Sequence, residues 1–213
     1  MNKAKFSFIL LLLLTYILSN AQQSDLWLIN GKKVTISNYK IDTSDFYNKK
    51  ILYTTIKGKT KSKYIDDVFS IVNENKKETV FYKRDDSIGY TLTQNQMRSY
   101  LYGLHDMHNI HISPLITLGG FASGMIATFI PMPQIYMFYL PVGILVPLAY
   151  VSVINYTPPS EIKLKNRLPE KANDDFYILG YQDGLRKKRI RNSLIGAGVG
   201  ILAGFFITTT IIK

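Results

Sequence analysis

The chain of 213 residues contains no cysteine. Disulfide bonds, thiolate metal sites and lipid attachment to an N-terminal cysteine are therefore excluded. Acidic residues are also few, with 15 Asp and Glu against 26 Lys and Arg, which gives a formal net charge of +11. The chain needs anionic partners or a solvated surface for this excess of cations.

Charge of either sign is missing from two long stretches. Residues 107–160 and residues 192–212 contain no Asp, Glu, Lys or Arg. A run of 54 uncharged residues is too long for the helical core of a water-soluble protein. Three membrane-spanning helices are expected instead, over residues 114–130, 135–156 and 193–212. Because these spans hold no charged side chain, a proton relay or an ion pathway built from carboxylates is disfavoured.

Prolines shape the predicted helical hairpin. The first span would be ~26 Å long, just enough for a hydrocarbon core of ~30 Å if its flanks contribute. Pro131 and Pro133 end that helix and turn the chain. Pro141 and Pro147 are expected to kink the returning helix, which lipid-embedded helices tolerate when neighbours repair the freed carbonyls.

The first 21 residues have the pattern of a signal peptide. Lys3 and Lys5 precede an apolar stretch, and small residues lead up to Ala21. Cleavage there would make Gln22 the new N-terminus. The alternative is an uncleaved anchor, for which the apolar stretch is short. The expected location is the bacterial inner membrane, with the following module in the periplasm. An exported chain meets little nucleic acid, so anionic lipid headgroups are the expected partner.

Residues 22–90 are predicted to form a small β-module. Asn30-Gly31 between two apolar runs is a strong hairpin signal, because such turns need positive φ. Five or six short strands within about 60 residues bury a core only by curling, which favours an SH3-like or Sm-like barrel. Small barrels bind peptides, nucleic acids or sugars, or act as spacers, and the fold alone does not choose.

Three segments carry a family resemblance. They read DLWLINGKKVTISNYKI, IDDVFSIVNENKKETVFYK and LTQNQMRSYLYGLHD. This pattern resembles an uncharacterised family of exported membrane proteins from the Bacteroidota envelope, which join an N-terminal β-module to C-terminal glycine-bearing spans. The resemblance extends over most of the chain after the signal peptide. It implies an envelope location and no known activity.

A short motif occurs twice in the second half of the chain. The spacing Tyr-x-x-Gly-x-x-Asp is shared by two sets of residues, Tyr100, Gly103 and Asp106, and Tyr177, Gly180 and Asp183. Each copy is followed by a polar stretch and then by a glycine-bearing span. We interpret this as an internal repeat of a juxtamembrane helix, a collar and a span. Parallel repeats of this kind occur in transporters.

Small residues recur at four-residue spacing in two spans. Such spacing places them on one helical face, where backbones can approach closely. The predicted helix-packing residues are Gly120, Gly124, Gly196, Gly200 and Gly204.

The polar collars of the two copies differ in residue type. The first holds His105, His108 and His111, and the second holds Arg186, Lys187, Lys188, Arg189 and Arg191. Both are interpreted as interfacial collars, and the cations are expected to contact lipid headgroups. The three-residue spacing of the histidines leaves a metal site or a pH sensor as a weaker alternative.

The predicted topology contains a conflict. Three spans after an exported module leave residues 157–191, with nine Lys and Arg, in the periplasm, against the positive-inside tendency. Either the first hairpin does not cross fully, or the N-terminus is an uncleaved anchor. The expected order is a signal peptide (1–21), a β-module (22–90), an amphipathic juxtamembrane helix (91–112), a helical hairpin (113–156), a basic loop with a second juxtamembrane helix (157–192) and a third span (193–213).

The sequence contains no recognisable catalytic motif. A phosphate-binding glycine loop, Gly-x-Ser-x-Gly and His-Glu-x-x-His are all absent. The paired acids Asp66-Asp67, Asp85-Asp86 and Asp174-Asp175 have the pattern of helix caps or solvated faces. We therefore expect an α+β membrane protein that is no enzyme, needs no cofactor and acts in interaction or assembly, as a homo-oligomer or with an envelope partner. The alternative is a small oligomeric transporter or channel subunit; a membrane-embedded enzyme would need a constellation that is absent.

Overall fold

The computed structural model describes residues 23–45, 48–130, 134–135, 138–139, 142–157, 170–171 and 173–211. The chain forms two compact units, Met1–Met97 and Arg98–Lys213, and each is described by itself. The predicted signal peptide with its cleavage site at Ala21 and Gln22, and most of the basic loop, lie outside the described residues.

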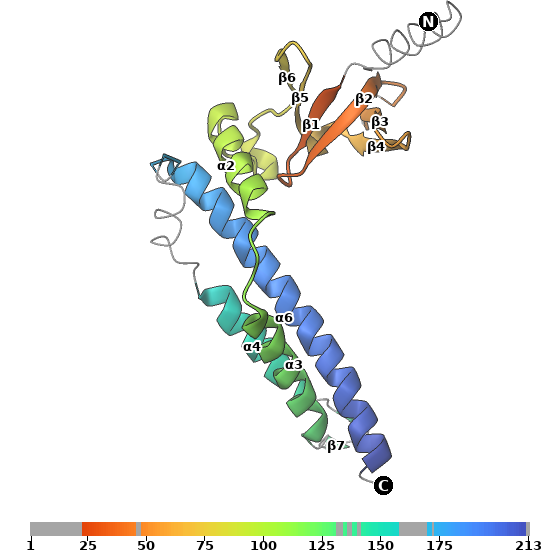
Figure 1. Ribbon diagram of the computed structural model, residues 1–213, viewed down its shortest axis with the longest axis vertical. Helices are drawn as coiled ribbons and strands as arrows, with labels where there is room; N and C mark the ends of the chain where they lie inside the picture. Colours follow the sequence, from red (N-terminus) through yellow and green to blue (C-terminus); the bar gives the residue numbers. More distant parts are fainter. Residues whose placement is uncertain are drawn as a thin grey trace, which may run out of the picture. The chain divides into compact units, whose positions relative to one another are not determined.

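The first unit is a six-stranded antiparallel sheet with the order β4-β3-β2-β1-β5-β6 (Figure 1). Short 3-10 helices, η1 (Ile65–Asp67) and η2 (Asp86–Ile88), follow β4 and β6. The strands are β1 (Ser24–Leu28), β2 (Lys33–Asp42), β3 (Lys50–Thr55), β4 (Thr60–Tyr64), β5 (Val68–Val72) and β6 (Glu78–Val80). This sheet, together with the helices that follow, confirms the α+β architecture.

The β1–β2 hairpin forms where the Asn-Gly signal predicts it. Only Gly31 has positive φ, at 77°, and Leu28 N donates to Lys32 O at 2.9 Å. The loop is therefore longer than the two-residue turn that the dipeptide suggests. Its register sets Leu26 opposite Val34 and aims alternate residues into the core. Five core side chains are fully buried: Leu26, Ile36, Ile51, Val68 and Ile71.

The sheet stays open, so the prediction of a closed SH3-like or Sm-like barrel is wrong. In the described residues, β4 pairs only with β3, and β6 pairs only with β5. Lys61 and Lys63 of β4 stand directly opposite the buried Tyr53 and Ile51, on the core side of the edge. Closing the barrel would remove these ammonium groups from water, which is costly, above all for Lys61, because Lys63 lies 3.8 Å from Asp67. Lys61 is nevertheless exposed and Lys63 partly exposed, and charged side chains on an edge strand are a known way of protecting it from further pairing.

The second unit is built from helices. The described helices are α2 (Gln94–Met107), which begins in the first unit, α3 (Pro114–Phe129), α4 (Leu145–Tyr156) and α6 (Asp175–Ile211). A small hairpin, β7 (Gln134–Ile135) and β8 (Phe138–Tyr139), and a 3-10 helix, η3 (Val142–Ile144), lie between α3 and α4.

Two neighbouring segments differ in how a helix is interrupted. Ser113 caps the start of α3, with its hydroxyl accepting a hydrogen bond from Leu115 N, and Pro114 occupies the first turn. A proline there disfavours helix in the residue before it, so α2 and α3 are separate. α6 has no such signal and runs without a break through the predicted boundary between residues 192 and 193.

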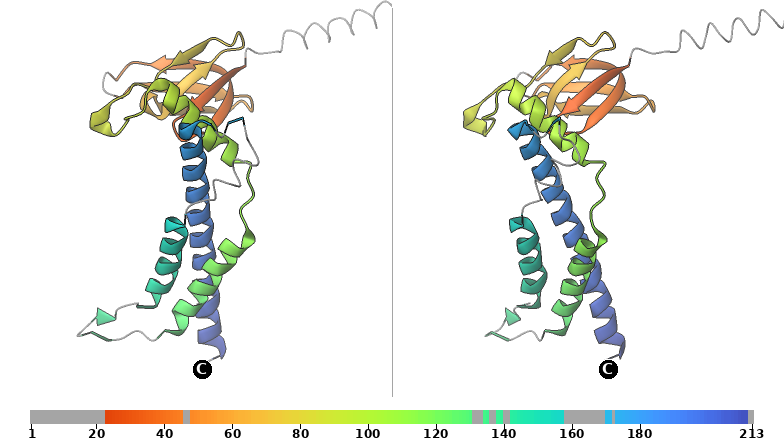
Figure 2. Two further views of the ribbon diagram at one scale, coloured as in Figure 1. Left: turned by 90° about the vertical axis from the view of Figure 1, so that its left-hand side faces the viewer. Right: turned by 60° about the vertical axis from the view of Figure 1, so that its left-hand side comes forward.

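α3 and α6 run side by side in the same direction, and α4 lies along them (Figures 1 and 2). By length and composition, the described part of the chain has one helix able to cross a membrane, within Asp175–Thr210.

The prediction of three full-length spans is not met, because α3 has 16 residues and α4 has 12. α4 begins at Leu145 and not at 135. A helix through Pro141 would lose a backbone hydrogen bond, whereas Pro147 lies in the first turn of α4, where proline is tolerated.

Candidate functional site

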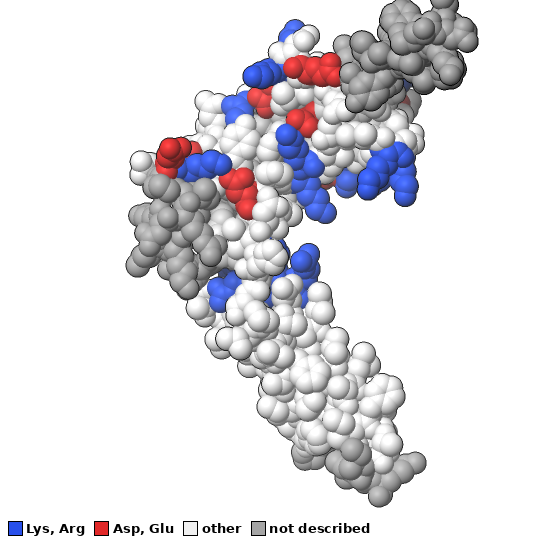
Figure 3. Space-filling view, viewed as in Figure 1, with Lys and Arg blue, Asp and Glu red and all other residues white. Residues whose placement is uncertain are grey.

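The candidate site is the surface of α3, α4 and the C-terminal half of α6. Small residues are buried there, including Gly120, Gly124 and Ala197. Large apolar side chains point outward: Leu118 is 58% exposed and Phe206 is 67% exposed. Figure 3 shows no charged side chain on the visible face of this region. A water-soluble monomer rarely exposes so many large apolar side chains together, and a surface of this kind is typical of a membrane-facing or protein-binding region.

The α3–α6 contact is made by glycines. A Cβ at Gly120 would overlap the carbonyl of Ser193, and one at Gly124 would overlap that of Ala197. The same holds from the other helix, where Gly196 lies against Thr117 O and Gly200 lies against Phe121 O. Since each overlap is with backbone, no side-chain rotation can relieve it. The two backbones are therefore as close as glycine permits.

All five glycines singled out for helix packing lie in this interface. Gly204, the last of them, lies against the side chain of Thr128 and the carbonyl of Met125. By contrast, a Cβ added at Gly198 would meet no atom within 4 Å, so this glycine faces away from α3. The hydroxyls in the interface are satisfied within their own helices, since Ser123 donates to Gly120 O at 2.7 Å and Ser193 donates to Ile190 O at 2.8 Å.

The α3–α4 contact was not predicted from the sequence. The ring of Tyr150 lies over Gly119, and its hydroxyl donates to Ile116 O at 3.1 Å. Gly143, just before α4, lies against Ala127 O. Gly119 is adjacent to a glycine in the packing series, but the four-residue spacing assigns it no role. Its function becomes visible only once the partner helix is placed.

The two Tyr-x-x-Gly-x-x-Asp motifs pack against each other. Tyr100 donates to Asp183 Oδ2 at 2.9 Å, and Tyr177 donates to Asp106 Oδ2 at 2.8 Å. Each tyrosine thus bonds the aspartate of the other motif.

The glycine of each motif lies against a backbone carbonyl of the other motif. Gly103 lies against Tyr177 O, and Gly180 lies against Tyr100 O. The motif residues are therefore a reciprocal clasp between α2 and the start of α6. We call these six residues the Tyr–Asp clasp.

Burial and hydrogen bonds shift the pKa values of two groups in the Tyr–Asp clasp. Burial raises the pKa of Tyr100, and its bond to Asp183 raises it further, so the hydroxyl stays a donor. Burial also acts to raise the pKa of Asp106, but hydrogen bonds from Lys171 and Tyr177 outweigh it and the pKa is lowered. Lys171 Nζ is 2.7 Å from Asp106 Oδ2. Asp106 is therefore held as a carboxylate.

The basic collar is largely engaged within the protein. Lys188 Nζ donates to His108 O at 3.0 Å and to Ile110 O at 2.7 Å, beyond the end of α2. Arg189 Nη1 donates to Thr157 O at 2.9 Å, at the end of α4. Lys188 thus satisfies two carbonyls in the loop after α2, and Arg189 satisfies the carbonyl of the C-cap residue of α4, where a cation also interacts favourably with the helix dipole.

Of the other collar cations, Arg186 Nε donates to Asn155 Oδ1 at 2.6 Å. Lys187 and Arg191 are exposed, and among the described residues neither has a hydrogen-bond or ion-pair partner. The prediction that all five cations contact headgroups therefore needs refinement, because three of them also bind groups of the protein. Figure 3 shows blue side chains bordering the uncharged region.

The histidines do not share one helical face. α2 ends at Met107, so His108 and His111 lie beyond it. His108 Nδ1 is 2.8 Å from Leu104 O. No group of three His, Cys, Asp or Glu within the described ranges could hold a metal ion. The geometry therefore offers no support for the metal alternative at His105, His108 and His111.

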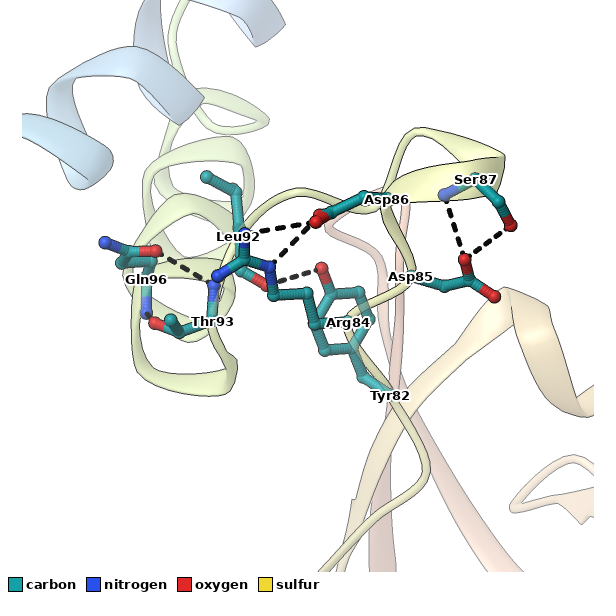
Figure 4. Close-up of polar contacts among 8 residues, drawn as sticks. All are labelled: Tyr82, Arg84, Asp85, Asp86, Ser87, Leu92, Thr93 and Gln96. Atoms are coloured by element: carbon teal, nitrogen blue, oxygen red, sulfur yellow. Dashed lines mark hydrogen bonds and ion pairs between the residues drawn. The ribbon is translucent and has the colours of Figure 1, made fainter.

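The paired acids serve as caps and surface partners. Asp174 accepts from Phe176 N and Tyr177 N at the start of α6, at 2.9 and 3.2 Å. In the first unit, Asp85 accepts from Ser87 N at 2.9 Å, and Asp86 pairs with Arg84 at 3.1 Å (Figure 4).

Further hydrogen bonds drawn in Figure 4 hold the segment that leads into α2. Thr93 N donates to Gln96 Oε1 at 2.9 Å, and Gln96 N donates to Thr93 Oγ1 at 3.4 Å, which is a capping box. Tyr82 donates to Leu92 O at 2.9 Å, and burial raises the pKa of this tyrosine. The start of α2 is thereby tied to the end of the sheet.

A cavity of about 510 Å³ in the first unit is lined by residues that follow β4 and by residues at and after the end of β6. Ile65 and Asp66, after β4, form one wall, and Val80 and Phe81 form another. The remaining lining includes both signs of charge: Lys49, Lys83 and Asp85. The size suits a small ligand, but the balanced charges select no ligand class.

No family model, curated protein or solved structure matches this chain.

Proposed function

We propose that the protein is a membrane-anchored component of the bacterial cell envelope that acts in interaction or assembly and catalyses no reaction. The observation that carries the proposal is the reversed polarity of the helical unit. Gly120 and Gly124 are buried, whereas Leu118, Leu202 and Phe206 are each more than half exposed. In water this surface would drive aggregation; in lipid it is a normal exterior.

α6 is the membrane-crossing element of the proposal. α3 and α4 are shorter than a span, and we propose that they lie in the lipid against α6. Their interface depends on close backbone packing, which drives helix association in lipid because there is no hydrophobic gain between helices there. The exposed cations Lys187 and Arg191 would then meet anionic headgroups at the boundary of the uncharged region.

Membrane anchoring is tested by extraction. After lysis, alkaline carbonate should leave the full-length protein in the membrane pellet, and mild detergent should release it. A variant with Leu194, Leu202 and Phe206 changed to Asp should lose membrane retention, because each carboxylate at the centre of a spanning helix costs about 2.5–3.5 kcal/mol. Recovery of the wild-type protein in the carbonate supernatant would contradict the proposal.

We further propose the inner membrane as the location, with the β-module in the periplasm, in keeping with the resemblance to exported Bacteroidota proteins. Because the chain lacks cysteine, one introduced cysteine reports topology without background. Ala172→Cys should react with a membrane-impermeant thiol reagent in intact spheroplasts. Protection of that thiol until lysis would overturn the periplasmic assignment and favour the positive-inside orientation.

The interaction role is supported by what the described residues provide. Asp85 and Asp174 are caps, Asp86 is a surface ion-pair partner, and Asp106 and Asp183 belong to the Tyr–Asp clasp. The described part of the helical unit presents packing faces and no polar channel lining. Crosslinking in intact cells, followed by purification in mild detergent, should recover the chain in a defined complex with itself or with an envelope protein. A protein that remains monomeric and without partner under these conditions would sink the assembly role while leaving the anchor intact.

A small oligomeric transporter or channel subunit is the second candidate. The reciprocal packing of the Tyr–Asp clasp supports it, because parallel repeats are a feature of transporter folds. Proteoliposomes should then show flux above protein-free vesicles, and Gly200→Leu should abolish it while Gly198→Leu should not. Absence of flux for a panel of ions and small solutes would leave the anchor as the better account.

A further inference from the structure

The β3–β4 hairpin displays an apolar side chain at its tip. Ile56 is 58% exposed, at the turn between the two strands. The turn itself is firmly held: Gly58 N donates to Thr55 O at 2.8 Å, Thr55 N donates to Lys59 O at 3.0 Å, and Gly58 has φ of 74°. A left-handed glycine is well suited to this position. Ile56 is therefore presented to the surroundings by an ordered turn.

Lysines surround this apolar tip. Residues 46–65 contain six lysines and no acidic residue. Lys57, Lys59 and Lys61 are exposed, and none of them has an acidic partner among the described residues. Lys63, farther along β4, lies 3.8 Å from Asp67. Figure 3 shows blue side chains gathered over β3 and β4.

We propose that the β3–β4 tip docks on an anionic lipid surface, with Ile56 entering the interfacial layer and Lys57, Lys59 and Lys61 contacting headgroups. Each lysine close to such a surface adds attraction, and an aliphatic side chain gains by leaving water. The proposal rests on the proposed membrane anchoring, which brings the module and lipid into one assembly, and adds a second contact made by the module itself.

An aliphatic tip separates this partner from other polyanions. Proteins that bind single-stranded nucleic acid stack bases on aromatic side chains, and the tip offers Ile56 and no aromatic ring. A polysaccharide provides no apolar phase for an isoleucine. Of these three polyanions, the lipid surface is the one that offers anions beside an apolar layer.

The turn between β5 and β6 serves as an internal control for the β3–β4 tip. It carries Lys76 and Lys77, but Glu74 and Glu78 accompany them, and it presents no large apolar side chain. A reporter at Asn75 in that turn should therefore stay in water when the tip reporter enters lipid.

The test uses the full chain with one cysteine, labelled with an environment-sensitive fluorophore. Ile56→Cys and Asn75→Cys are reconstituted in vesicles of phosphatidylcholine alone or mixed with phosphatidylglycerol. The emission at position 56 should shift to the blue only with phosphatidylglycerol, and high salt should weaken the shift. Position 75 should show no shift. Adding Lys57→Glu, Lys59→Glu and Lys61→Glu should abolish the shift, whereas Lys77→Glu should preserve it.

The outcomes separate this proposal from membrane anchoring. Vesicle flotation in high salt reports anchoring by α6, and the emission at position 56 reports the tip. Flotation with unshifted emission in anionic vesicles would overturn the tip proposal and keep the anchor. A blue shift without salt-resistant flotation would support the tip and overturn the anchor. An equal shift with dextran sulfate in the absence of vesicles would overturn lipid as the partner.

Discussion

The two copies of the Tyr-x-x-Gly-x-x-Asp motif lead into glycine-bearing helices in different ways. The first copy breaks after α2, and α3 starts anew at Ser113 and Pro114. The second copy continues without interruption as α6, through its collar of cations and into its glycine series. Long, unbranched cations favour helix, whereas a serine followed by proline starts a new one.

α6, the uninterrupted helix, supplies hydrogen bonds to the loop that follows α2. The break beyond α2 leaves His108 O and Ile110 O without helical donors, and Lys188 of α6 supplies both hydrogen bonds. Arg189 does the same for Thr157 O at the end of α4. One uninterrupted helix thus stabilises the ends of two shorter ones. Lys188 and Arg189 of the collar therefore have a structural role within the protein.

The largest effect is expected from the glycine interface that joins the copies. Gly124→Leu places a side chain into the carbonyl of Ala197, so α3 and α6 must separate. We expect a loss of about 3 kcal/mol in the free energy of unfolding, measured by denaturant titration in mild detergent. Gly198→Leu is the matched control, because it faces open space, and it should cost nothing or stabilise α6 slightly. Equal losses for both variants would refute the interface.

The Tyr–Asp clasp should have the next largest effect. Tyr100→Phe and Tyr177→Phe each remove one hydroxyl from a partly buried carboxylate, and each should cost about 1–2 kcal/mol. The double variant should lose close to the sum, because the two bonds involve different pairs. Tyr156→Phe, at a tyrosine that is 81% exposed, should change little. The same unfolding midpoint for the double variant and wild type would show that the clasp does not stabilise the protein.

Removing Lys188, which donates to two carbonyls in the loop after α2, should lower the free energy of unfolding by less. Lys188→Met leaves two carbonyls without their donor and should cost about 1 kcal/mol. Lys187→Met is the control in the adjacent position, and as a surface change it should stay within about 0.5 kcal/mol. Amide exchange in residues 104–110 should accelerate only in the first variant. Indistinguishable exchange in the two variants would argue against the repair role.

The smallest effect is a pH dependence of the clasp. The folded-state pKa of Asp106 lies below its ordinary value of 3.8, because bonds from Lys171 and Tyr177 outweigh burial. Its contribution to stability is therefore present above pH 3.8 and is lost as pH falls through the lower folded value. Asp106→Asn should be less stable than wild type at neutral pH, and the difference should shrink in acid. Parallel stability–pH curves for the two proteins would contradict this.

Local features could be predicted from the sequence where one segment holds the whole signal. The Asn30-Gly31 hairpin, the start of α3 at Ser113-Pro114 and the spacing of the packing glycines all depend on a few neighbouring residues. Barrel closure does not, because it requires β4 and β6 to meet, and Lys61 and Lys63 on the core side of β4 disfavour it. The start of α4 also eluded prediction, because the proline at position 141 was expected to kink the helix and the helix begins after it.

The candidate site divides in the same manner. Glycine spacing and the repeated motif indicated which residues belong to it. Tyr150 on Gly119, Lys171 on Asp106 and Lys188 on Ile110 O became visible only when the helices were placed. These pairs are far apart in the chain, and each residue alone has an ordinary neighbourhood.

Three properties follow from the residues alone: one half of the chain is charged and the other has long stretches without charge, no disulfide or thiolate site exists, and glycines line two helical faces. Composition and periodicity suffice for these properties, because they depend on the side chains and the helical repeat. The folded arrangement was needed to show that the tyrosine of each motif bonds the aspartate of the other and that the collar cations bind helix ends. Such pairings depend on which backbones approach closely, and that is set by packing between distant segments.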